Sequence, residues 1–600
     1  MNLFTIPEMI LKTCNKYSDT RQAIFYKENG KYTSINYSDL KDKVQSLALA
    51  LLDLGLHQRD RIGIIGENRL EWLITDFAIQ LIGGVVVPVF STLSSKQEEY
   101  IYSDCEASAI FVTNNFHLQK VLEFKDNVPS LRHIFVMNDD FSTSELCVKS
   151  FSKLLEIGDD LKSNTDRDKF FEEYIKKIEL EDLSALIYTS GTTGNPKGVM
   201  LRHSNLSTNM IDSCERVKFN ENDMFLSYLP WCHSYERMVI YSAFYSGSQI
   251  AIAESIETVA SNINEIKPTL VTTVPRLLEI VKKKITQGME KETLVKQNIF
   301  KWALKVGEEY ITQKFQGKTS IMLKTQYEIA DKLVFSKIRA KLGGRGFRFI
   351  AGGAALSTDV WKFFQAAGFE VHSGYGLTEA SPVVSVTENS NFEFGTVGRP
   401  FTHIELKIAS DGEILIKGPS IMAGYWQDKE ATRAAIDDDG WLYTGDIGEL
   451  TSKGNLKITD RKKYIIVTSS GKNIAPQPIE ELICRSPYID QCFLLGDNRE
   501  FCTALITPDY EAIKKLADTF GLEYKSENDL INNEKIIKTI RNEIDYLQKD
   551  LAKYERIRKF TLLPRPFSIE NGELTPKLSV RRHIVERNYS YLIEEMYNVS

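Results

Sequence analysis

Short runs rich in β-branched residues alternate with longer amphipathic segments from Arg61 to about Ser373. Buried parallel strands with helices crossing between them have this pattern. Because ligands of such sheets bind at the carboxyl ends of the strands, we expect a nucleotide site in this large α/β region. The predicted strands are Arg61–Ile65, Val85–Val89, Ala109–Val112, Ile134–Val136, Ala185–Tyr188, Gln249–Ile252, Thr269–Thr272 and Phe347–Ile350.

The pattern changes from about residue 395 to 459, where short strands are separated by turn sequences such as Ser410-Asp-Gly412 and Asp438-Asp-Gly440. This favours a small antiparallel β subdomain that completes an N-terminal domain of residues 1–459. The predicted fold class is therefore a large N-terminal α/β domain, with parallel sheets, flanking helices and a small β subdomain, followed by a smaller mobile α+β C-terminal domain at 464–600.

Bulk composition limits the class of protein. A chain of 600 residues is too long for one hydrophobic core, so two or more domains are expected. The net charge of −7 argues against a nucleic-acid partner. Eight scattered cysteines without a Cys-x-x-Cys pair favour reduced thiols in a cytoplasmic protein. The longest apolar stretch, Phe77–Phe90, is too short to span a bilayer, and the N-terminus has no signal-peptide pattern.

Segment 281–345 differs in charge from the rest of the chain. It holds 15 lysines and arginines against 6 aspartates and glutamates. One interpretation is a helical pair packed on the main domain with a solvated basic face; the other is that this face rests peripherally on an anionic membrane. One apolar helical face is predicted from Ile299, Trp302, Ala303, Val306 and Tyr310.

The chemistry begins with the run Thr189–Gly198, which follows an apolar strand directly. Its glycines let the backbone approach a polyanion, its N–H groups and hydroxyls bind phosphate oxygens, and its lysine adds positive charge. It is not a Walker A loop, since the lysine follows Asn-Pro and precedes glycine. The predicted ATP-binding residues here are Thr189, Ser190, Gly191, Thr192, Thr193, Gly194 and Lys197.

This run resembles the phosphate-binding loop of the adenylate-forming superfamily, which includes acyl-CoA synthetases, luciferases and nonribosomal adenylation domains. The other motifs of that family follow in order, and the resemblance covers nearly the whole chain. It implies ATP with Mg²⁺ and an acyl-adenylate intermediate. Within the superfamily the chain looks most like long-chain fatty acyl-CoA synthetases, which implies a fatty acid and coenzyme A as further substrates, and a homodimer is one possible assembly.

The second motif is Gly374-Tyr-Gly-Leu-Thr-Glu379. Glu379 is a carboxylate that suits Mg²⁺ on the ATP phosphates, and the resemblance adds Thr189 as a catalytic and metal-binding residue. In the family the positions of Tyr375, Gly376 and Thr378 bind adenine and phosphate. The resemblance also implies that the small residues of the upstream segment, here Gly353 and Ala354, line the adenine and acyl pockets.

The third motif is Tyr443-Thr-Gly-Asp-Ile447, followed by Asp460-Arg461. By resemblance, Asp446 binds the ribose hydroxyls and Arg461 contacts ribose and phosphate with its planar guanidinium. The family pivots its C-terminal domain at this point, so Asp460 to Lys463 are the predicted hinge.

Two further stretches resemble the long-chain branch. In Ser469–Glu480 the resemblance implies that Gly471 and Lys472 help to shape the CoA tunnel. In Leu229–Arg237 it places His233 near the acyl carboxylate, as a catalytic residue. A lone histidine is more often structural, but this one follows a strand and a proline in the expected order.

The C-terminus departs from the family pattern. The family's catalytic lysine would fall at Ser579, whereas the sequence has a lysine two residues earlier, at Lys577. In an extended segment these two positions share a face, so Lys577 is the predicted catalytic lysine. The alternatives are Arg581 or a weakened first half-reaction.

Two rival functions remain open from the sequence. A ligase that passes the acyl group to a carrier protein would use the same first step; the resemblance of the stretch from Gly471 favours CoA. A catalytically weak nucleotide-binding scaffold is suggested by Ser579.

Overall fold

The computed structural model describes residues 2–162, 166–189, 195–344, 346–469, 472–568, 570–574 and 580–598. The chain divides into two compact units. Unit 1 comprises Met1–Leu406, Leu415–Tyr443 and Ser452–Leu456, and unit 2 comprises Lys407–Ile414, Thr444–Thr451 and Lys457–Ser600.

The first sheet of unit 1 has eight strands in the order β15-β14-β13-β12-β10-β11-β1-β2. All neighbours from β14 to β1 pair in parallel, whereas β15 and β2 are antiparallel edge strands. The strands are β1 (Gln22–Glu28), β2 (Lys31–Asn36), β10 (Met224–Ser227), β11 (Gln249–Ile252), β12 (Leu270–Thr273), β13 (Arg348–Ala351), β14 (Glu370–Gly376) and β15 (Val383–Val386).

The second sheet of unit 1 also has eight strands, in the order β18-β9-β8-β4-β3-β5-β6-β7. Its strands from β8 to β7 pair in parallel, and β9 and β18 add an antiparallel edge. The strands are β3 (Arg61–Ile65), β4 (Val85–Val89), β5 (Ala109–Val112), β6 (His133–Val136), β7 (Val148–Ser150), β8 (Leu183–Thr189), β9 (Lys197–Arg202) and β18 (Gly424–Tyr425). All eight sequence-predicted strands are confirmed to within one or two residues at most ends.

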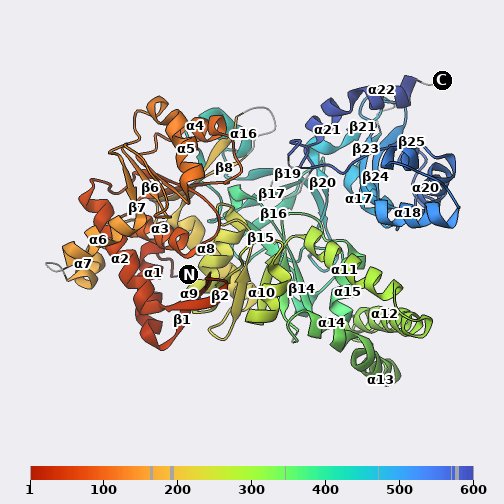
Figure 1. Ribbon diagram of the computed structural model, residues 1–600, viewed down its shortest axis with the longest axis horizontal. Helices are drawn as coiled ribbons and strands as arrows, with labels where there is room; N and C mark the ends of the chain where they lie inside the picture. The colour runs from red at the N-terminus through yellow and green to blue at the C-terminus, as the bar shows by residue number, and fades with distance from the viewer. Residues whose placement is uncertain are drawn as a thin grey trace. The chain divides into compact units, whose positions relative to one another are not determined.

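Helices flank both sheets (Figure 1). They start at local signals; α1, for example, begins with a capping box in which Thr5 and Glu8 satisfy each other's backbone N–H groups. The helices of unit 1 outside segment 281–345 are α1 (Ile6–Tyr17), α2 (Tyr37–Asp53), α3 (Leu70–Leu81), α4 (Ser95–Asp104), α5 (Asn115–Phe124), α6 (Phe151–Lys162), α7 (Arg167–Tyr174), α8 (His203–Val217), α9 (Ser234–Tyr245), α10 (Val259–Ile266), α15 (Thr358–Ala366) and α16 (Lys429–Ala435).

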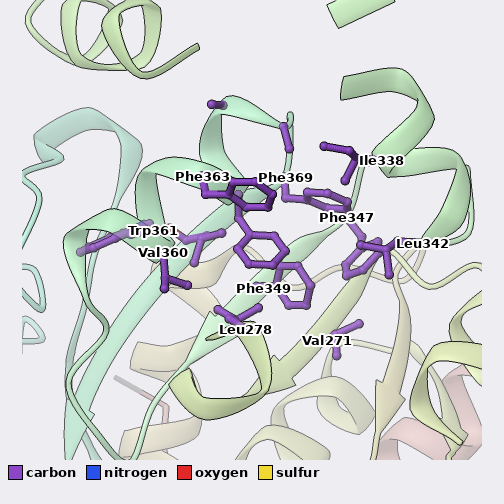
Figure 2. Packing of buried hydrophobic residues seen from close by; sticks show 14 of the residues in the cluster. Val271, Leu278, Ile338, Leu342, Phe347, Phe349, Val360, Trp361, Phe363 and Phe369 are labelled. Atoms are coloured by element: carbon purple, nitrogen blue, oxygen red, sulfur yellow. Dashed lines mark hydrogen bonds between the residues drawn. The ribbon is translucent and has the colours of Figure 1, made fainter. Parts of the chain in front are cut away.

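An aromatic cluster forms the core between the first sheet and α15. Phe349 on β13 packs edge-on against Phe347 and Phe364, with ring centroids 4.7 and 5.6 Å apart. Figure 2 shows Phe347, Phe349, Phe363 and Phe369 gathered in this core, where the ring centroids of Phe349 and Phe369 lie 5.7 Å apart. Burying such rings stabilises this core, since each removes a large apolar area from water.

Segment 281–345 is helical and packs on this core. Its elements are α11 (Pro275–Glu290), α12 (Leu294–Phe315), α13 (Ile321–Ala330), the π-helical turn η4 (Asp331–Phe335) and α14 (Ser336–Lys341). Ala303 and Val306 are buried as predicted, and Ile299 and Tyr310 are partly buried against the core. Trp302 was wrongly placed on that face, because it is 38% exposed and Phe300 is buried in its stead.

Unit 2 has a three-stranded sheet in the order β23-β24-β25, covered by helices, which confirms the α+β prediction. A four-stranded sheet in the order β16-β17-β19-β20 lies in the region of the predicted β subdomain, and its strands contain residues assigned to both units. The elements are β16 (Glu405–Ile408), β17 (Glu413–Lys417), β19 (Leu442–Leu450), β20 (Leu456–Arg461), β21 (Ile466–Val467), β22 (Asn473–Ile474), β23 (Ile489–Leu495), β24 (Cys502–Pro508), β25 (Ile557–Leu562), α17 (Pro476–Ile483), α18 (Tyr510–Thr519), α19 (Glu527–Ile531), α20 (Glu534–Leu547), α21 (Arg582–Asn588) and α22 (Ser590–Asn598). No helix among the described residues is both long and apolar enough to cross a bilayer.

Candidate nucleotide and acyl site

Polar loops meet where the parallel strands of the first sheet end. The 3-10 turn η5 (Thr378–Ala380) follows β14, and the start of α9 lies beside it. The hydroxyls of Ser234 and Thr378 are 3.0 Å apart, and the phenol of Tyr235 donates a 2.8 Å hydrogen bond to the carbonyl of Ile350 on β13. The structure thus brings the His233 loop, the segment after β13 and the Thr378–Glu379 turn to one edge, as parallel sheets do for ligand sites.

His233 caps α9. Its Nδ1 accepts a 3.1 Å hydrogen bond from the backbone N–H of Tyr235. Because Nδ1 is an acceptor there, the neutral ring carries its proton on Nε2. The ring therefore presents a donor on its other side, which suits a carboxylate or phosphate oxygen. The centre of the half-buried ring also lies 6.4 Å from the ring centre of Phe90, the residue that directly follows β4, so the histidine has an apolar neighbour.

A buried carboxyl group supports this loop from behind. Glu236 is fully buried and accepts hydrogen bonds from the hydroxyls of Ser227 and Thr272, the latter at 2.5 Å. The indole N–H of Trp231 donates to Ser227 at 2.8 Å, so the network fixes the loop that carries His233. Burial raises the pKa of Glu236 to about 7, in spite of the two hydroxyl donors.

The predicted phosphate loop joins two antiparallel strands. Thr189 ends β8 and is the ladder partner of Lys197, which begins β9. The two predicted ligands at the ends of the loop are therefore neighbours across a hairpin. The residues between them that were predicted to bind ATP, Ser190, Gly191, Thr192, Thr193 and Gly194, lie outside the described residues.

Tyr425 connects Lys197 with Glu379. It lies on β18, which pairs with β9, and its phenol donates a 3.0 Å hydrogen bond to Glu379 Oε1. The ammonium of Lys197 lies 5.3 Å from the centre of the Tyr425 ring and 3.8 Å from the carboxylate of Asp428. Burial and the neighbouring Glu379 carboxylate raise the pKa of Tyr425, which keeps the phenol a donor. Neither Tyr425 nor Asp428 was predicted from the sequence as a site residue. Both lie outside the family motifs, and only the Gly-Tyr pair at 424–425 marks their position.

Glycine is required at two predicted positions. A Cβ on Gly376 would lie 2.0 Å from the carbonyl oxygen of Pro382, so no side chain fits there. Gly353 has a φ of +81°, which glycine adopts without strain, and it is exposed together with Ala354. Tyr375 is half-buried and pairs with Ser385 in the ladder of β14 and β15. Tyr375 and Gly376 end the strand that leads into the turn carrying Glu379.

The carboxylate of Glu379 is an oxygen ligand of the kind that can hold a magnesium ion together with phosphates. Among the described residues no lysine or arginine pairs with its half-buried carboxylate. No group of three or more metal-ligating side chains occurs in the described part of the chain. One such carboxylate matches Mg²⁺, which keeps few protein ligands and takes the rest from water and phosphate. Thr189 remains the second predicted ligand.

Unit 2 holds the remaining predicted nucleotide ligands. Arg461 Nε lies 3.1 Å from Asp446 Oδ1, and Asp446 is buried whereas the arginine is half-exposed. Two hydrogen bonds within and beside β19 hold the backbone around this aspartate, because its N–H donates to Thr444 Oγ1 at 3.1 Å and the N–H of Gly445 donates to the carboxylate of Glu413 at 2.9 Å. The two residues thus form one carboxylate–guanidinium pair suited to a ribose and a phosphate.

The predicted hinge is tied to α17. The buried carboxylate of Asp460 accepts 2.6 and 3.1 Å hydrogen bonds from the N–H groups of Arg461 and Gln477, and burial raises its pKa. Lys463 is exposed over the Tyr464 ring, at 4.8 Å.

The other predicted residues of unit 2 are only partly described. Lys472 is exposed, with its ammonium 5.9 Å from the Tyr554 ring centre. Arg581 precedes α21 and donates its backbone N–H to Glu573 at 2.8 Å. Gly471, Lys577 and Ser579 lie outside the described residues.

Comparisons with known proteins give the family. The family described as AMP-binding enzyme matches residues 11–426, and the AMP-binding enzyme C-terminal domain matches residues 463–600. The chain belongs to the AMP-binding enzyme family.

The relatives of this AMP-binding enzyme are similar along most of their length. It is 33% identical over 576 residues to the long-chain-fatty-acid–CoA ligase FadD15 of Mycobacterium bovis, covering 95% of this chain and 93% of that one. It is 33% identical over 615 residues to long-chain-fatty-acid–CoA ligase 5 of Rattus norvegicus, covering 97% and 86%.

Solved structures share its fold. The adenylation domain of a carboxylate reductase from Mycobacterium chelonae superposes with a TM-score of 0.74 at 21% identity, over 99% of this chain and 91% of that one. ATP-bound MatB from Rhodopseudomonas palustris gives 0.70 at 19% identity, over 98% and 100%. The family and the fold class are thus as the sequence predicted, whereas the site residues of this AMP-binding enzyme remain predictions.

Proposed function

We propose that this AMP-binding enzyme activates a long-chain fatty acid with ATP to acyl-AMP, releasing pyrophosphate, and then transfers the acyl group to coenzyme A, releasing AMP. The observation that carries the proposal is the polar edge where Lys197, Tyr425 and Glu379 adjoin the Ser234–Thr378 contact. The curated relatives named as long-chain-fatty-acid–CoA ligases support the choice of substrates.

The first step needs help because a carboxylate is a poor electrophile and must receive a better leaving group. A carboxylate oxygen attacks the α-phosphorus of ATP, and pyrophosphate leaves with the electrons of the broken P–O bond. Lys197 supplies positive charge to the phosphates, and the Nε2–H of His233 can bind and orient the fatty-acid carboxylate. Asp446 and Arg461 would bind the ribose and phosphate of the nucleotide.

Glu379 would hold Mg²⁺, with Thr189 as a second oxygen donor, and the bound ion would neutralise phosphate charge. The phenol of Tyr425 fixes one oxygen of that carboxylate, so its other oxygen is oriented before ATP arrives. Lys577 is the proposed source of positive charge from the C-terminal domain.

In the second step the thiol sulfur of CoA attacks the acyl carbon and AMP leaves. Rotation of a C-terminal domain, 464–600, about the hinge Asp460–Lys463 would exchange the residues used in the two steps. Gly471 and Lys472 would contact CoA.

The test measures pyrophosphate release with fatty acids of increasing chain length, without acceptor, and then thioester formation with CoA or with a carrier protein. We expect release that is greatest with long chains, and transfer to CoA. Transfer to a carrier protein alone would identify the rival ligase. Absence of release at every chain length would favour a nucleotide-binding scaffold and overturn the proposal.

Further parts of the proposal concern location. We propose a cytoplasmic enzyme in which the basic segment 281–345 makes peripheral contact with an anionic membrane, where long-chain fatty acids partition. A homodimer is a further prediction, which size-exclusion chromatography with light scattering would test.

A further inference from the structure

An exposed apolar stripe runs along the outer side of α13 and η4. We define the outer stripe as Ile321, Met322, Ile329 and Leu333, which are 86, 72, 49 and 43% exposed. Positions 321, 329 and 333 are separated by multiples of four, and 322 adjoins the first, so all four lie on one side of the helix. A soluble protein seldom leaves so many large apolar side chains together in water unless something covers them.

The exposure does not result from loose packing of the helix. The opposite side of α13 is anchored, because the Tyr327 ring stacks on Tyr310 at 4.0 Å and its phenol donates a 2.9 Å hydrogen bond to the carbonyl of Ala366. Leu323 and Phe335 are buried on the same side. Helices α12 and α13 lie side by side in Figure 1. The outer stripe is therefore held on a fixed helix.

Lysines border the outer stripe. Residues 318–341 contain five lysines, all exposed: Lys318, Lys324, Lys332, Lys337 and Lys341. Of the two acidic residues there, Asp331 is neutralised by Arg339 through hydrogen bonds of 2.7 and 2.8 Å. Only Glu328 remains to balance five positive charges.

This charge distribution indicates which kind of partner covers the outer stripe, a second copy of the chain or a lipid surface. A second copy docked through the same stripe would bring two sets of five lysines together, because a two-fold interface places identical surfaces in contact. An anionic lipid surface instead attracts the lysines and accepts apolar side chains between its headgroups.

We propose that the outer stripe of α13 and η4 docks on an anionic lipid surface, with its apolar side chains entering the headgroup region and its lysines pairing with lipid phosphates. This docking surface specifies which residues of segment 281–345 make the proposed membrane contact. It does not depend on the adenylate chemistry, which is measured separately by pyrophosphate release.

Co-sedimentation of the full chain with vesicles tests the proposal. One set of vesicles is phosphatidylcholine alone and the other contains about one third phosphatidylserine. We expect binding to the second set that weakens with added salt, since lysine–phosphate attraction is screened. A triple variant, Met322→Gln, Ile329→Gln and Leu333→Gln, should bind at least about tenfold more weakly. A double variant, Lys324→Glu and Lys332→Glu, should lose the preference for phosphatidylserine.

The matched control is Leu146→Gln with Ile256→Gln, which removes two other apolar side chains that are 94 and 55% exposed. It should bind as the unaltered chain does. Each variant is checked by its thermal unfolding midpoint, because all the altered side chains are exposed and folding should not change. Equal sedimentation with both vesicle sets, or equal binding by the triple variant, would overturn the proposal. The proposal would also be overturned if the unaltered chain binds no vesicles and the triple variant changes its oligomeric state.

Discussion

The phenol of Tyr425 lies 3.0 Å from Glu379 Oε1 and donates its proton to that carboxylate. The two residues are 46 positions apart in the sequence, and β18 brings them together by pairing with β9. Because the ring of Tyr425 also faces the ammonium of Lys197, one side chain contacts both the proposed metal ligand and the proposed phosphate ligand.

Tyr425→Phe should lower kcat/KM for MgATP by roughly tenfold, since a hydrogen bond to a charged group contributes about 1.5–3 kcal/mol. The Mg²⁺ concentration that gives half the maximal rate should rise, because the carboxylate loses the donor that orients it. Steady-state kinetics across a Mg²⁺ titration measures both effects.

The control for Tyr425→Phe is Tyr32→Phe, because the phenol of Tyr32, on β2 of the first sheet, donates to the carbonyl of Ile252 at 3.0 Å. It should leave the Mg²⁺ dependence unchanged. If Tyr425→Phe lowers the rate with no shift in Mg²⁺ dependence, the tyrosine only supports the fold.

Lys577→Ala should slow adenylate formation by roughly 10²–10³-fold, because it removes one positive charge that stabilises the transition state. Formation of the thioester from synthetic acyl-AMP and CoA should be much less affected. Arg581→Ala is the comparison variant, since it removes the alternative cation. Equal slowing of both half-reactions by Lys577→Ala would contradict its assignment to the first step.

Glu236→Gln should change how stability depends on pH. The pKa of buried Glu236, about 7, is above its unfolded value of 4.5, so the folded state binds the proton more tightly. Its contribution to stability is fully present below about pH 4.5 and is lost as the pH rises to about 7. As the pH rises from 4.5 to 7, the urea unfolding midpoint of the unaltered chain should therefore fall relative to that of the variant. A difference that stays constant over this range would show that the carboxyl does not titrate there.

Gly376→Ala should destabilise the chain by at least about 2 kcal/mol, since its Cβ would lie 2.0 Å from the Pro382 carbonyl oxygen and the backbone would have to move. Gly288→Ala is the matched control on α11, where a Cβ meets nothing within 4 Å and alanine favours the helix. Urea denaturation of both variants gives the comparison. Equal stability of the two would mean that the end of β14 accommodates a side chain at position 376.

Local patterns of the sequence determined the strands and the class of fold. The run Val85–Val89 is apolar at every position and β-branched at four of five, so it predicts a strand buried on both faces wherever it packs. The motif that ends in Glu379 could also be identified from the sequence, because its glycines and its acidic residue occur within six residues. The prediction that Trp302 lies on the buried face was wrong, because helical spacing gives the width of an apolar face only to within a residue or two.

Tertiary structure decided which residues meet. Tyr425 reaches Glu379 and Ser234 reaches Thr378 only through sheet pairings and helix packing between segments 46 and 144 residues apart, and hydrophobic patterning does not encode such pairings. It likewise decided that Ile321 and Met322 face water, because the same apolar periodicity would suit a buried helix face. The sequence by itself determined a large α/β domain and predicted a phosphate-binding loop, since both depend on neighbours along the chain. The side chains around Glu379 and the exposed stripe depend on neighbours in space, and only the fold brings these together.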